Sequence, residues 1–180
     1  MPTYTFVSKD LLNTAIIPDE PHHWIAYSTS TTSNVLGPKL TLLTPSVVRN
    51  TYGPALDGAI DWKEETFVIG GRSAKWANLK CKLSRRSGSA REWKWFGERF
   101  TVKYESGTGR WTAKSGSPAH ADDAVFTVRK HRIFGADDPA TIEFALNVSA
   151  RDMVFLILVL IYSETKRQQR KEKVAVAVAG

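Results

Sequence analysis

Ten apolar residues without a polar interruption lie near the C-terminus and form the most hydrophobic segment of the core-forming sequence: Met153-Val154-Phe155-Leu156-Ile157-Leu158-Val159-Leu160-Ile161-Tyr162. Ser149 and Asp152 precede it at the spacing of a capping box, in which Ser149 would cap the first turn of a helix. Basic side chains follow it, as expected at a helix C-terminus; they are Lys166, Arg167, Arg170 and Lys171. We therefore predict a helix near residues 150–171, with a buried strand as the alternative because β-branched residues are plentiful here.

The predicted helix is too short in its apolar part to cross a membrane. Ten residues of helix rise about 15 Å, whereas the hydrocarbon core of a bilayer is about 30 Å thick. Charged residues bound the apolar stretch on both sides, at Arg151, Asp152 and Glu164. A helix that is apolar on every side must be buried on every side. A β-barrel closed around it would bury it in this way.

Most of the remaining chain alternates between apolar and polar residues, as a half-buried antiparallel strand requires. The clearest examples are Leu79–Leu83, Phe100–Tyr104 and Ile142–Val148. Shorter strand candidates are Thr3–Val7, Trp24–Ser28, Lys39–Thr44, Ala59–Trp62, Thr66–Ile69, Trp93–Phe96, Gly109–Ala113 and Val125–Arg129.

Turn-forming residues separate these strands at short intervals. The turns are Gly70-Gly71, Ser87-Gly88-Ser89, Gly107-Thr108-Gly109 and Gly116-Ser117-Pro118. The polar stretch Ser28–Ser33 is interpreted as a loop. Many short strands with regular turns predict a mainly-β sandwich or barrel.

The length of 180 residues suits one domain, which we place at residues 1–173. Residues 174–180 form an apolar, low-complexity tail that we expect to fray or to add a short edge strand. Cys81 is the single cysteine, and Met1–Phe6 does not resemble a secretory signal. Both features predict a reducing, cytoplasmic location. Cys81 falls on the apolar side of its predicted strand, which favours a core position over a nucleophile.

The positive charge of the chain is concentrated in one region. The net charge is +7, but residues 72–114 alone hold twelve basic residues and only three acidic ones. A concentrated positive face attracts anionic partners.

Four motifs follow one another along the chain: Ala59-Ile60-Asp61-Trp62, Glu92-Trp93-Lys94-Trp95, Phe100-Thr101-Val102-Lys103-Tyr104 and the helix Asp152–Tyr162. Their order resembles a fungal domain-of-unknown-function family, number 6593. The resemblance covers roughly Val48 to Lys173, although Trp93 stands where members usually carry Tyr, and Gly116–Asp123 is longer and less regular than expected. The family is similar to the tubby C-terminal and phospholipid-scramblase-like fold. The resemblance implies an antiparallel barrel of about a dozen strands around one central hydrophobic C-terminal helix.

Some tubby-like domains bind phosphoinositide headgroups, and the basic region offers residues for that role here. Cations on neighbouring strands would hold phosphates by charge-assisted hydrogen bonds. We therefore predict a non-enzymatic domain that engages anionic phospholipid headgroups, peripheral at membranes. The candidate phosphate-binding residues are Lys80, Lys82, Arg85, Arg86, Lys94 and Arg99.

The alternative is a small-molecule-binding or catalytic β-barrel, favoured if His120 or His131 shared a deep pocket with a carboxylate. No cofactor, metal site or catalytic residue is expected, because His22-His23 lacks metal-ligand spacing and no zinc or nucleophile motif occurs. Nucleic acid is an unlikely partner. Stacking of nucleic-acid bases would need exposed aromatic side chains. We expect the tryptophans among the cations to fill the core instead; they are Trp76, Trp93, Trp95 and Trp111.

Overall fold

The structure is a computed structural model that describes residues 1–20, 25–35, 37–46, 56–81, 90–116, 122–130 and 137–179. One antiparallel sheet of thirteen strands accompanies two helices. Its strands are β1 (Thr3–Phe6), β2 (Thr14–Pro18), β3 (Tyr27–Asn34), β4 (Gly37–Pro45), β5 (Gly58–Asp61), β6 (Thr66–Ile69), β7 (Arg72–Lys75), β8 (Lys80–Cys81), β9 (Arg91–Trp95), β10 (Glu98–Glu105), β11 (Arg110–Ser115), β12 (Ala124–Thr127) and β13 (Thr141–Phe144). The helices are α1 (Trp76–Leu79) and α2 (Ala150–Ala179).

The sheet has the order β7-β6-β5-β4-β3-β2-β1-β13-β12-β11-β10-β9-β8. Its two edge strands, β7 and β8, are consecutive in the chain and are joined by the four residues of α1. The mainly-β prediction with a C-terminal helix is confirmed. The sheet is not closed, however, because no ladder joins β7 to β8 in the described part of the chain. The α1 side chains Trp76 and Leu79 are buried, and the Trp76 ring packs against Tyr162 of α2, with centroids 4.5 Å apart.

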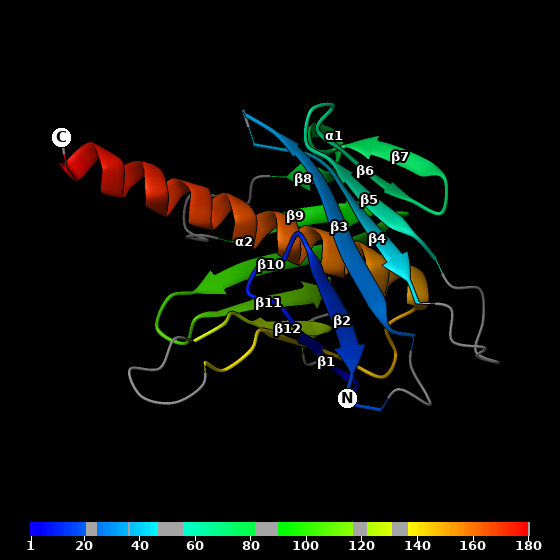
Figure 1. The fold of residues 1–180 in the computed structure, drawn as a ribbon. Coiled ribbons are helices and arrows are strands. Elements are labelled where there is room, and N and C mark those ends of the chain that lie inside the picture. The colour runs from blue at the N-terminus through cyan, green and yellow to red at the C-terminus, as the bar shows by residue number, and fades with distance from the viewer. Residues whose placement is uncertain are drawn as a thin grey trace.

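Helix α2 is the centre of the core, and the prediction of a helix rather than a buried strand is confirmed. Every residue from Met153 to Tyr162 is buried. The predicted cap is also present: the Asp152 N–H donates to Ser149 Oγ at 3.2 Å, and Ser149 Oγ donates to the Asp152 carboxylate at 2.5 Å. The N-terminal half of α2 lies among the strands, and its C-terminal end projects beyond them (Figure 1).

Strands that are far apart in the sheet contact the same residues of α2. The Phe155 ring stacks on Trp95 of β9, with centroids 5.2 Å apart, and meets Phe67 of β6 edge-on at 6.2 Å. The Tyr4 hydroxyl of β1 donates to Met153 Sδ at 3.4 Å. The sheet therefore curves around α2, so that a helix without a polar face has no exposed side in this segment.

Three local predictions are wrong. Ser28–Ser33 belongs to β3 rather than a loop, because the hydroxyl groups that point inward find hydrogen-bond partners. Thr29 Oγ1, for example, donates to the Leu11 carbonyl at 3.0 Å. The strand predicted over 142–148 ends at Phe144, after which the chain turns and leaves Leu146 exposed. Cys81 is exposed rather than in the core. Leu79 belongs to α1, and the two-residue β8 is too short to continue the predicted alternation of apolar and polar residues.

The helix also extends further than predicted. It reaches Ala179, so the segment expected to fray or to form a strand is helical to that residue. No helix in the described part of the chain is long and apolar enough to span a membrane.

Candidate functional site

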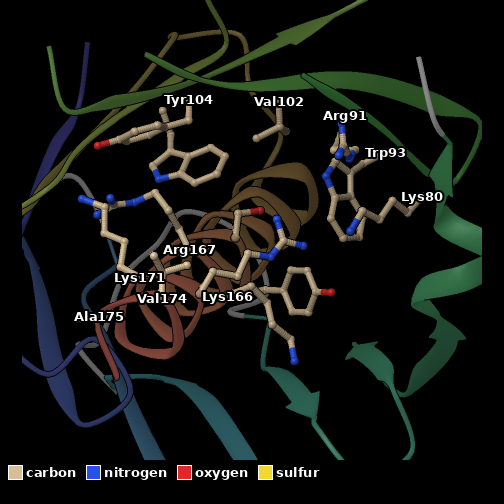
Figure 2. A pocket seen from close by; sticks show the side chains of 14 residues that line it. Lys80, Arg91, Trp93, Val102, Tyr104, Lys166, Arg167, Lys171, Val174 and Ala175 are labelled. Carbon is tan, nitrogen blue, oxygen red and sulfur yellow. The ribbon is translucent and has the colours of Figure 1, made fainter. Parts of the chain in front are cut away.

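A pocket of about 640 Å³ lies where α2 leaves the sheet. Its walls come from β8, β9, β10, β11 and the C-terminal half of α2 (Figure 2). We call it the basic pocket, because six of the described residues that line it are cations and none is a carboxylate. The cations are Lys80, Arg91, Lys166, Arg167, Arg170 and Lys171.

The strand side of the basic pocket is fixed by the pairing of β8 with β9. Lys80 pairs with Trp93 in register, so the two side chains leave the same face of the sheet. The Lys80 ammonium lies 5.4 Å from the centroid of the Trp93 ring and 5.6 Å from that of Tyr162 on α2. Arg91 begins β9 two residues before Trp93, and therefore shares its face. Figure 2 shows Lys80, Arg91 and Trp93 grouped on this wall.

The helix side follows from the spacing of the α2 cations. Lys166 and Arg170, like Arg167 and Lys171, are four residues apart, and residues at this spacing lie above one another on a helix. The Lys166 ammonium lies 5.6 Å from the Trp62 ring centroid and 5.9 Å from that of Tyr162. These cations therefore line one stripe of α2 as it passes the ends of the strands.

A buried carboxylate anchors this stripe. Glu164 is 1% exposed and accepts hydrogen bonds from Trp111 Nε1 at 2.9 Å and from Gln168 Nε2 at 2.9 Å. Arg167 donates to the same carboxylate from Nε at 2.7 Å and from Nη2 at 2.6 Å. The guanidinium also lies 4.6 Å from the centroid of the Tyr104 ring. Glu164 thus ties α2 to β11 and holds Arg167 in the wall of the pocket.

The pocket carries an excess of positive charge. Of its six cations, only Arg167 has an ion pair within the described part of the chain. Burial lowers the pKa of Lys80, and the charges of Arg91, Arg170 and Lys166 lower it further. Among the described residues, Trp93 Nε1 and Arg167 Nη1 are buried donors without an acceptor. The five cations without an ion pair supply accessible hydrogen-bond donors and positive charge together, which suits an anionic ligand.

The structure separates the phosphate-binding residues predicted from the sequence. Lys80 lines the basic pocket. Lys94 and Arg99 are register partners on β9 and β10, and both are exposed on the outer face, where Arg99 forms an ion pair with Glu92 at 3.1 Å. Lys82, Arg85 and Arg86 lie outside the described residues, as do His22, His23, His120 and His131.

The sequence does not indicate most of the pocket. Cations near a helix C-terminus are expected without any binding site, although the four-residue spacing of those on α2 marks one face of the helix. They are Lys166, Arg167, Arg170 and Lys171. Arg91 was counted in the basic region without being assigned to a site. The predicted core positions of Trp76, Trp93, Trp95 and Trp111 are confirmed, since all four are buried.

Within the described residues, no three His, Cys, Asp or Glu side chains gather as a metal site would require. Comparison of the chain with protein-family models, curated proteins and solved structures found no match. The resemblance to the fungal family and to the tubby-like fold therefore remains a prediction from the motifs.

Proposed function

We propose that this chain is a non-enzymatic binding domain for anionic phospholipid headgroups, which it engages through the basic pocket. The observation that carries the proposal is the convergence of six cations, without a lining carboxylate among the described residues, on one cavity. Near an anionic bilayer, each of these cations that lacks an ion pair adds about 1 kcal/mol of attraction. Phosphate groups would accept charge-assisted hydrogen bonds from Arg91 and Arg170.

The rest of the lining supports an amphiphile rather than a free inorganic ion. Trp93, Val102 and Trp111 give the pocket an apolar base, and Val174 and Ala175 continue it along α2. Val174 and Val176 are exposed on the projecting part of the helix. Cations next to exposed apolar side chains match the order of layers at a membrane surface, where phosphates lie above acyl chains.

A small-molecule site is the second candidate, and the size of the cavity favours it. A volume of about 640 Å³ lies within the range of roughly 300–1,000 Å³ that is usual for ligand pockets. This alternative requires that the ligand enter the pocket without a bilayer.

The experiment compares two charge reversals in a vesicle-sedimentation assay with phosphoinositide-containing and neutral vesicles. The double variant Arg170→Glu/Lys171→Glu reverses the charge of two exposed residues of the pocket. The double variant Lys94→Glu/Arg99→Glu makes the same charge change on the outer face. All four side chains are exposed, so neither variant should alter the fold. We expect the pocket variant to lose at least about tenfold in vesicle affinity and the outer-face variant to bind nearly as the parent chain does.

The reverse result would assign binding to the outer face and contradict the pocket. Equal losses would indicate attraction by net charge alone. Pocket-dependent binding of a short-chain, soluble phosphoinositide without binding to vesicles would favour the small-molecule alternative.

A further inference from the structure

Lys80 lies in the wall of the basic pocket, among other cations and beside two aromatic rings. Its side chain is half-buried, and the ammonium lies over two aromatic rings, 5.4 Å from the Trp93 centroid and 5.6 Å from the Tyr162 centroid. The ammonium forms no ion pair or hydrogen bond within the described part of the chain. An amine that is partly buried among cations, with no carboxylate beside it, is more easily deprotonated than an amine in water.

We propose that Lys80 is a nucleophilic amine that forms an imine with an anionic aldehyde or ketone held in the basic pocket. The proposal rests on the geometry of Lys80 and does not depend on the proposed binding of phospholipid.

Neighbouring cations favour the neutral, reactive form of this amine. Arg91 faces it from β9, and Lys166 and Arg170 face it from α2; burial and these three charges lower the pKa of Lys80. The Tyr162 phenol stays protonated, because burial and then the charge of Glu65 raise its pKa. A desolvated lysine beside other cations is the arrangement that activates an amine for imine formation.

The same cations would bind the reactant. A carboxylate or phosphate on the carbonyl compound would contact Arg91 or Arg170, which holds the carbonyl carbon near Lys80. The amine lone pair forms the new C–N bond as the C=O π bond breaks, and one amine proton moves to the oxygen to give a carbinolamine. The C–O bond then breaks, the oxygen leaves as water with the second amine proton, and the imine is formed. The step needs no oxidant or reductant, and hydrolysis reverses it.

The test uses pyridoxal 5′-phosphate as the probe, because it joins an aldehyde to a phosphate. The folded full chain is exposed briefly to the probe at neutral pH, the imine is reduced with borohydride, and modified lysines are quantified by peptide mass spectrometry. Lys94 is the matched control, an exposed lysine on the neighbouring strand β9. We expect Lys80 to be modified at least about tenfold faster than Lys94.

Three further measurements separate activation of the amine from simple access to it. Pyridoxal, which lacks the phosphate, should modify Lys80 more slowly than the phosphorylated probe does, while Lys94 should react with both at similar rates. The rate at Lys80 should also reach half its maximum at a lower pH than the rate at Lys94. Lys80→Arg, which keeps a cation over Trp93, should remove the fast reaction and retain the fold, as checked by thermal unfolding.

Modification of Lys80 no faster than that of Lys94 would overturn the proposal. Equal rates at Lys80 with the two probes would also overturn it, since the pocket would then not hold the anion.

Discussion

At the scale of single residues, Glu164 shows how a charged side chain can be placed in the interior. Its carboxylate accepts four hydrogen bonds, from Trp111, Gln168 and two nitrogens of Arg167. A buried charge is tolerable only when it is paired and its oxygens are satisfied in this way. From the sequence, Glu164 is simply the polar end of an apolar stretch, because its partner Trp111 is distant in the chain.

Glu164→Gln should therefore destabilise the protein by roughly 2–4 kcal/mol, since it leaves the Arg167 guanidinium in the pocket wall without its counter-charge. The matched control is Glu92→Gln, which breaks the exposed ion pair with Arg99 and should cost less than about 1 kcal/mol. Chemical denaturation of both variants gives the two free energies of unfolding. Equal and small losses would show that Glu164 is not an anchor.

At the scale of elements, α2 could be predicted because its signals are local. The cap at Ser149 and the ten-residue apolar stretch both lie within one segment, and both are confirmed. The end of the helix is predicted too early, because the cations after Tyr162 are typical of a helix C-terminus. The structure uses them as a pocket wall, and the helix continues through Ala179.

Short elements were harder to predict. Helix α1 has four residues, too few to show a helical period, and its last residue, Leu79, begins the strand predicted over Leu79–Leu83. Only Tyr27 and Ser28 of β3 fall within a predicted strand, because Ser and Thr also favour turns and loops. In the structure, the inward-facing hydroxyl of Thr31 is paired with that of Thr41 on β4, at 2.7 Å.

The packing of α2 on β5 leads to a prediction at Gly58. A Cβ atom placed there would lie 3.0 Å from Leu158 Cδ1 and 3.0 Å from Val154 Cγ1. Gly58→Ala should therefore cost about 1–3 kcal/mol through overpacking. Gly107→Ala is the control, because a Cβ at Gly107 meets nothing within 4 Å, and should change stability by less than about 0.5 kcal/mol. Thermal unfolding compares the two, and an undisturbed Gly58→Ala would contradict the close approach of helix and strand.

At the scale of the whole molecule, the sequence shows where positive charge is concentrated along the chain but not which cations line the same cavity. The basic region at residues 72–114 supplies Lys80 and Arg91, whereas the other four pocket cations come from α2, more than fifty residues later. Only the curvature of the sheet around α2 brings these segments together. The inward or outward direction of each cation also depends on register: Lys80 follows Trp93 inward, while Lys94 and Arg99 face out.

The most direct measurement is sedimentation of the purified chain with phosphoinositide-containing and neutral vesicles, each at low and at high salt. We predict binding to the phosphoinositide-containing vesicles at low salt, a marked loss at high salt because charge attraction is screened, and little binding to neutral vesicles. Absence of binding at low salt, or equal binding to both kinds of vesicle, would contradict the claim that the basic pocket recognises anionic phospholipids.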